Sequence, residues 1–200
     1  ADKYGRKKIL LIIAALYSLS AIGSALARNW HIFLIARFIG GIGVGASSVV
    51  GPAYISEISP SHIRGRLVAL FQLNVVIGIL TAFFSNYIIA SALTENAWRW
   101  MFGVEFFPAV IFFVLIFPIP YSPRWLAKKS KPEEARNTLE NLGEQNLEKA
   151  MQEIIESLRT DEKSKETKLF SRKYRYPILL AFLVAMFNQL SGINAIMYYA

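Results

Sequence analysis

Hydrophobic residues in this chain are gathered in long blocks instead of alternating with polar positions. A helix needs about 20 mostly apolar residues to cross the hydrocarbon core of a bilayer. Five blocks approach or exceed that length with at most one charge each, and they are residues 9–27, 30–56, 67–90, 100–120 and 176–200. The pattern predicts an all-α membrane protein that crosses the bilayer several times.

The connections between these blocks differ sharply in charge. Of the 22 lysines and arginines, 19 lie in residues 1–8, 57–66 and 120–175, whereas the alternate connections hold only Arg28 and Arg99. Cytoplasmic loops of membrane proteins are enriched in basic residues, so these three segments are predicted to face the cytoplasm. The net charge of +8 is then explained without a nucleic-acid partner. Five spans would leave the two ends on opposite sides, and we interpret the chain as a fragment of a larger transporter.

Residues 121–175 form the one stretch that resembles a soluble domain. Ser130 and Glu133 have the spacing of a capping box, which predicts a short helix that ends at Gly143. A second helix is predicted from apolar residues at helical spacing, namely Leu147, Ala150, Met151, Ile154, Ile155 and Leu158. We expect its apolar stripe to pack on the cytoplasmic face of the membrane bundle.

The second block is rich in small residues. No predicted strand precedes the run GGIGVGA at residues 40–46, so it does not fit a nucleotide-binding glycine loop. Small residues spaced like Gly41 and Gly45 let two membrane helices approach closely, and close packing is the better interpretation. Pro52 is expected to kink the same helix.

Two charged residues lie inside predicted spans. Arg37 follows Trp30 by seven residues and Glu105 follows Trp98 by seven, so each lies about 10 Å below the outer surface at about 1.5 Å per residue. Charges inside a membrane usually pair or face a water-filled cavity. An Arg37–Glu105 pair is therefore predicted, either as a structural lock between two helices or as a proton-coupling network. Spacing alone favours the structural lock.

Uncharged polar residues form the other group of candidates. Gln72 lies in the cytoplasmic third of the third block, and Asn188, Gln189 and Asn194 lie in the outer half of the fifth, beside a Ser191-Gly192 step. Broken membrane helices near the midplane are common at transporter binding sites. Amides and the Tyr198 phenol both donate and accept hydrogen bonds, which suits a neutral polyhydroxylated ligand. No metal or other cofactor is expected, because the chain has no cysteine and its two histidines fall on opposite membrane faces.

Six motifs in order resemble those of the sugar porters of the major facilitator superfamily. They are DKYGRKK at 2–8, RFIGGIGVG at 37–45, PAYISEISP at 52–60, IRGR at 63–66, PYSPRWL at 120–126 and QLSGIN at 189–194. The resemblance implies spans three to seven of a twelve-span transporter. Residues 1–120 would then belong to the N-terminal half, 121–175 to the intracellular helical domain, and 176–200 to the first span of the C-terminal half.

The resemblance also implies roles for individual residues. The substrate-binding set is Gln72, Asn188, Gln189, Asn194 and Tyr198; the cytoplasmic latch between the two halves is Asp2, Gly5, Arg6, Glu57, Arg64, Arg66 and Arg124. Asn188 stands where the family usually has Gln. Tyr121 replaces the usual Glu of its motif, which removes one acid from the latch.

The implied activity is transport and not catalysis. Family members move monosaccharides across the cell membrane by alternating access, usually as monomers. Arg37 and Glu105 match two positions of the proton-coupled bacterial members, which tilts the intramembrane pair towards proton symport. The resemblance implies that the proton-binding Asp of those members lies in a first span that this sequence does not contain. A facilitative uniporter, a non-transporting sugar receptor on the same fold, and a polyol substrate remain open.

Overall fold

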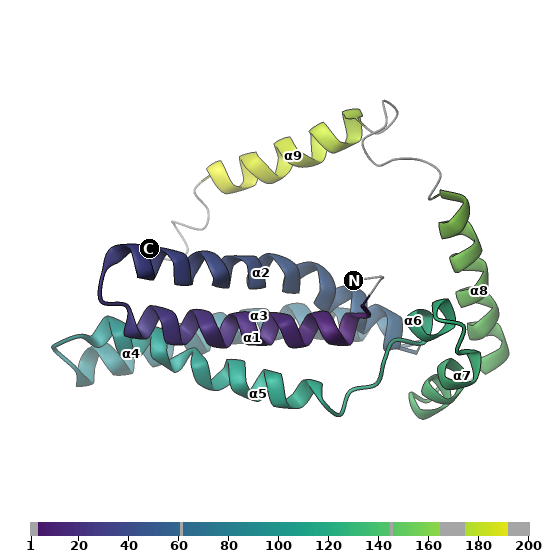
Figure 1. Cartoon of the computed structure of the whole chain (residues 1–200), viewed down its shortest axis with the longest axis horizontal. Coiled ribbons are helices and arrows are strands. Elements are labelled where there is room, and N and C mark those ends of the chain that lie inside the picture. Colours follow the sequence, from purple (N-terminus) through teal and green to yellow (C-terminus); the bar gives the residue numbers. More distant parts are fainter. Residues whose placement is uncertain (1–3, 61, 145, 165–174, 192–200) are drawn as a thin grey trace. The chain divides into compact units, whose positions relative to one another are not determined.

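The structure, a computed structural model, describes residues 4–60, 62–144, 146–164 and 175–191, and these residues form helices with no strand among them (Figure 1). Four helical stretches are long and apolar enough to cross a membrane. They are α1 (Arg6–Leu26), α2 (Trp30–Ile58), α3 (Arg64–Ala92), and α4 (Ala97–Val104) taken together with α5 (Phe106–Ile116). The all-α membrane fold predicted from the hydrophobic blocks is confirmed.

The chain separates into two compact units, one up to Ile155 and one from Glu156 onward. The first unit holds α1–α7 and the start of α8 (Leu147–Ser164). The second unit contains α9 (Arg175–Leu190), which is the described part of the fifth predicted span. The outer half of that span, from residue 192, lies outside the described residues.

The core of the first unit lies where α1 packs along α2 and α5. The buried residues of α2 are small or apolar and are spaced by three, four or seven positions, at Ala36, Gly40, Gly43, Val50 and Tyr54. The facing stripe of α1 is also buried and consists of Leu10, Ile13, Ala14, Ser20, Ala21 and Ser24. This spacing keeps each stripe on one face of its helix, so the two helices remain in contact over most of their length.

Close packing occurs through different glycines from the pair expected. A Cβ on Gly40 would collide with the Ser20 side chain of α1, and one on Gly43 would lie 3.2 Å from the Tyr17 ring. Neither Gly41 nor Gly45 has an atom within 4 Å of where a Cβ would stand. The prediction that Gly41 and Gly45 make the close contact is therefore wrong for the described residues, because the seam follows the stripe that contains Gly40 and Gly43. Helix α2 continues through Pro52.

The fourth span is interrupted at Glu105, between α4 and α5. Pro108 has no backbone N–H, and its ring clashes with the carbonyl four residues earlier, which belongs to Val104. The helical hydrogen bonding resumes only where Ala109 N–H donates to Glu105 O at 3.3 Å. Glu105, the one acid in this span, keeps right-handed helical angles (φ −58°, ψ −21°), so the interruption is one of hydrogen bonding and not of backbone conformation.

Two short helices follow the membrane bundle: α6 (Pro123–Lys128) and α7 (Pro132–Asn141). The capping box predicted at Ser130 is wrong, because α7 starts after Lys131, with Pro132 in its first turn, and Ser130 itself has φ 59°. The predicted end at Gly143 is confirmed. Gly143 has φ 78°, its N–H donates to Glu140 O and the next N–H donates to Leu139 O, which is the Schellman arrangement. Packing of the α8 stripe on the bundle stays a prediction.

Candidate functional site

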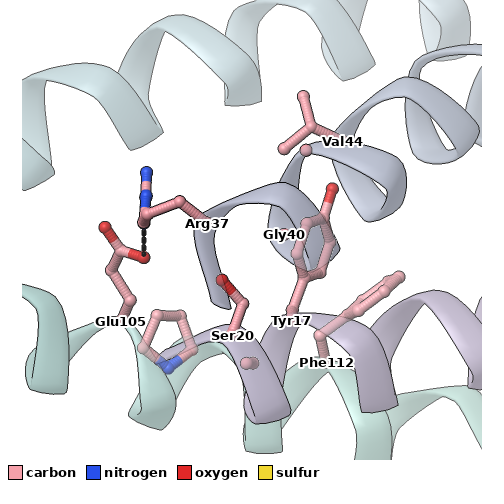
Figure 2. Close-up of a pocket in the computed structure, with 10 residues that line it drawn as sticks. Tyr17, Ser20, Arg37, Gly40, Val44, Glu105 and Phe112 are labelled. Carbon is pink, nitrogen blue, oxygen red and sulfur yellow. Dashed lines mark hydrogen bonds and ion pairs between the residues drawn. The ribbon is translucent and has the colours of Figure 1, made fainter. Parts of the chain in front are cut away.

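The intramembrane pair predicted from equal depth is formed. Arg37 of α2 donates from Nη1 to Oε2 of Glu105 at 3.2 Å (Figure 2). The Arg37 side chain is 42% exposed and that of Glu105 51%, so the pair lies at the edge of the bundle and not in its core.

A pocket of about 590 Å³ opens beside this pair. Its lining comes from α1, α2, α5 and the α4–α5 interruption, and consists of Tyr17, Ser20, Arg37, Gly40, Gly41, Val44, Glu105, Pro108, Ala109 and Phe112. In Figure 2 the Tyr17 and Ser20 side chains rise from α1 beside the ion pair. The Tyr17 hydroxyl lies 2.6 Å from the Ser47 hydroxyl. The pocket therefore presents two opposite charges and two hydroxyl groups against a largely apolar wall.

Aromatic rings support the pair on one side. The Arg37 guanidinium lies over the Phe102 ring, 4.9 Å from its centroid, and Phe102 packs edge-on against Phe33 at 5.2 Å. A cation over a ring face is attracted by the ring quadrupole. Phe33 lies about one helical turn before Arg37, and Phe102 lies about one turn before Glu105. The two rings therefore pack against each other one turn before the ion pair.

A second ion pair joins the beginning of α1 to the end of α2. Arg6 Nη2 lies 3.0 Å from Glu57 Oε1, and both side chains are largely buried, at 16% and 11% exposure. The other carboxylate oxygen, Oε2, accepts the Ser122 hydroxyl at 2.6 Å. Ser122 is itself buried and caps α6 by accepting from Trp125 N–H at 3.4 Å. One carboxylate thus connects three segments that are far apart in sequence.

Tyr121 adds to this junction although it is not an acid. Lys7 Nζ lies 5.2 Å from the Tyr121 ring centroid and donates to Phe117 O at 2.7 Å, and the Tyr121 and Trp125 rings stack at 5.2 Å. Gly5 has φ 84°, and a Cβ there would lie 3.1 Å from the Trp125 ring. The glycine therefore provides both the backbone conformation and the space that the stack needs.

The remaining latch residues are less closely grouped. Arg64 and Arg66 lie exposed in the first turn of α3 and make no ion pair with another residue in the described part of the chain. Arg124 lies on α6 and is half-buried. Asp2 lies outside the described residues.

The proposed substrate residues are only partly described. Gln72 is exposed on α3. Asn188 and Gln189 belong to α9, but only their helical backbone is described, and Asn194 and Tyr198 fall outside the described residues. No cluster of three or more potential metal ligands occurs among residues 4–60, 62–144, 146–164 and 175–191.

Sequence reasoning missed Ser122 and Pro108. The Ser-Pro step at 122–123 is a signal for a helix N-terminus, since serine is favoured at the cap and proline in the first turn. Pro108 stands three residues after the only acid of its block, which signals a break close to that acid. The stacking role of Tyr121 has no comparable signal in the sequence.

Comparison with known proteins places these features in one class. The sequence model of the family described as "Sugar (and other) transporter" matches residues 1–200. The chain is 38% identical to the arabinose-proton symporter of Bacillus subtilis (strain 168), with 100% of this chain and 44% of that protein covered. It is 40% identical to the glucose transport protein of Synechocystis sp., covering 100% of the chain and 45% of the relative.

The comparison of structures agrees with the comparison of sequences. The structure is similar to the partially occluded inward-open conformation of the xylose transporter XylE from E. coli, with a TM-score of 0.84, 34% identity, and coverage of 100% of this chain and 48% of that one. The fold defines the class as that of the membrane proteins of the major facilitator type. The chain belongs to the sugar transporter family, and it spans just under half the length of the relatives that it matches.

Proposed function

We propose that the chain is part of a monosaccharide–proton symporter of the cell membrane that works by alternating access. The observation that carries the proposal is the Arg37–Glu105 pair, at 3.2 Å inside two membrane spans and open to a pocket. Charges inside a membrane usually pair or face water, so a movement of α2 relative to α4–α5 that separates this pair is the proposed link between proton coupling and conformation.

The substrate is proposed to be a hexose or pentose held by Gln72, Asn188, Gln189, Asn194 and Tyr198. Relatives named for arabinose and glucose support a monosaccharide without selecting one. Amide and phenol groups match sugar hydroxyls, which need both donors and acceptors. We infer that the protein acts as a monomer within the lipid bilayer and needs no metal or cofactor.

The cytoplasmic junction is proposed to be the latch of alternating access. Its described centre is Glu57, which binds Arg6 and Ser122. Breaking a largely buried ion pair costs free energy, so these contacts would hold α1, α2 and the start of α6 together as the N-terminal side of the proposed latch.

The test is uptake of labelled D-xylose, L-arabinose and D-glucose into proteoliposomes that contain the full-length protein, with and without an inward proton gradient. Accumulation of one sugar above equilibrium only with the gradient is the expected result. Glu105→Gln should abolish accumulation but retain exchange of sugar across the membrane. Glu95→Gln, in the predicted outer connection, is the matched control and should leave accumulation unchanged.

Other outcomes point to the alternatives. Equilibration that ignores the gradient would indicate a facilitative uniporter, and sugar binding without flux would indicate a receptor. Uptake of myo-inositol in place of all three sugars would indicate a polyol carrier.

A further inference from the structure

A second pocket, which we call the outer arginine pocket, lies at the other end of the bundle from the Glu57 junction. It measures about 300 Å³ and forms where the α1–α2 turn meets the start of α4. Its lining consists of Ala27, Arg28, Asn29, Trp30, Phe33, Trp98 and Arg99. Three aromatic rings and two guanidinium groups share this space, and no acid lines it.

The charge of this pocket is unusual for its predicted side of the membrane. Arg28 and Arg99 are the only basic residues in the predicted outer connections, and both line the same pocket. The neighbouring acid, Glu95, is exposed and forms no ion pair with a described residue. Two unneutralised cations in one pocket favour an anionic occupant.

The two arginines differ in how firmly the protein holds their guanidinium groups. Arg99 donates from Nη1 to Ala25 O at 3.1 Å and lies over the Trp98 ring, 4.7 Å from its centroid, so its guanidinium plane is held in place. Arg28 is exposed and has no hydrogen bond or ion pair with the rest of the described chain. A fixed guanidinium beside a free one suits a group with several acceptor oxygens, because arginine carries five donors and no acceptor.

That chemistry distinguishes a phosphate from a sugar. Sugar hydroxyls need acceptors as well as donors, and the Asn29 amide is the one side-chain acceptor in the lining. A phosphodiester offers only acceptors. The aromatic wall, in which Trp30 stacks on Phe33 at 5.7 Å and Trp98 meets Phe33 edge-on at 6.0 Å, suits the apolar part of a lipid.

An apolar path leads from the pocket along α1. Residues spaced by three or four positions on one face of this helix are exposed, namely Ile12, Ala15, Leu19, Ile22 and Leu26. The last of them, Leu26, is 70% exposed and directly precedes Ala27 of the pocket lining. An acyl chain attached to a phosphate in the pocket could lie along this face. Tryptophans are enriched at the level of the lipid headgroups, as Trp30 and Trp98 would be.

We propose that the outer arginine pocket binds the phosphodiester headgroup of an anionic phospholipid of the outer leaflet. The proposal rests on the orientation predicted from the basic loops, and it is independent of which sugar is transported. Arg28 and Arg99 bind the phosphate oxygens, while Trp30 and Trp98 cover the glycerol and the first methylenes.

The test uses the full-length protein in phosphatidylcholine vesicles that contain a small fraction of photoreactive phosphatidylglycerol, followed by peptide mapping of the cross-links. Cross-links are expected on peptides that contain residues 26–33 and 97–102. Arg28→Gln should lower them about fivefold, since one surface arginine contributes about that factor to anionic-lipid binding. Arg159→Gln, an exposed arginine of α8, is the matched control and should not change them.

Four results would overturn the proposal. They are equal labelling of Arg28→Gln and the parent protein, cross-links confined to residues 120–175, equal labelling by photoreactive phosphatidylcholine, and displacement of the lipid by D-glucose. Soluble glycerol phosphate distinguishes a lipid from a free anion: it should not displace the lipid at millimolar concentration, and displacement there would also contradict the lipid as occupant. Arg28→Gln carries the test, because Arg99→Gln also removes the hydrogen bond to Ala25.

Discussion

Gly40 of α2 lies so close to Ser20 of α1 that a Cβ on the glycine would collide with the serine side chain. The next residue, Gly41, has open space around the same position. Two adjacent glycines in one helix therefore have opposite surroundings, and only one of them determines how closely α1 and α2 approach.

Substitution of these glycines should have opposite effects on stability. Gly40→Ala is expected to destabilise the full-length protein by about 1–3 kcal/mol, the usual cost of overpacking. Gly41→Ala should be neutral or stabilising by up to about 1 kcal/mol, because alanine is the better helix former. Thermal unfolding in detergent measures both. Equal losses for the two variants would show that helix propensity, and not contact with Ser20, governs this position.

The Arg37–Glu105 pair should show coupling in a double-mutant cycle. Arg37→Gln or Glu105→Gln leaves one unpaired charge between membrane spans, whereas the double variant leaves none. We expect the double variant to be more stable than either single variant by about 1–3 kcal/mol, between the values typical of exposed and buried pairs. Additive losses in thermal unfolding would mean that the two charges do not interact.

Pro108 should control the position of Glu105. Pro108→Ala restores a backbone donor that can reach the Val104 carbonyl, so α4 and α5 are expected to become one continuous helix. The added hydrogen bond would shift the Glu105 side chain relative to Arg37, and proton-driven sugar accumulation should fall roughly tenfold while the protein keeps or gains stability. Pro123→Ala, at the first turn of α6, is the control, since proline there removes no helical bond. Unchanged accumulation in Pro108→Ala would show that the helix interruption at Glu105 is not needed for proton coupling.

Tyr121 should act through its ring. Tyr121→Ala is expected to cost about 1–2 kcal/mol, because it removes the stack on Trp125 and the contact with Lys7. Tyr121→Phe keeps both and should behave like the parent protein. Thermal unfolding and cysteine cross-linking between α1 and α6 give the readout. A loss in the Phe variant equal to that in the Ala variant would assign the effect to the hydroxyl.

The membrane-spanning helices were predictable wherever the length of a hydrophobic block defines them. The spans that became α1, α2 and α3 follow from uncharged or nearly uncharged blocks, and the Arg37–Glu105 contact follows from equal depth in two such blocks. Both arguments need only the thickness of the bilayer and the rise of a helix.

Features that depend on which helix faces meet were not predictable in the same way. Gly40 and Gly41 are equivalent in the sequence pattern, and only the packing of α1 distinguishes them. Ser130 has the spacing of a capping box, but Pro132 takes the first turn of α7 and leaves Ser130 outside it. Tyr121 stands where the motif usually has an acid. Its stacking on Trp125 depends on the fold, which brings Lys7 and Gly5 alongside the two rings.

The Ser122 hydroxyl has one hydrogen and two lone pairs, and it acts both as a hydrogen-bond donor and as an acceptor. Its hydrogen goes to Glu57 and a lone pair receives the Trp125 N–H, so the torsion of this single C–O bond is fixed from two directions. The Glu57 carboxylate on α2 therefore sets the direction of a helix cap that lies 65 residues further along the chain.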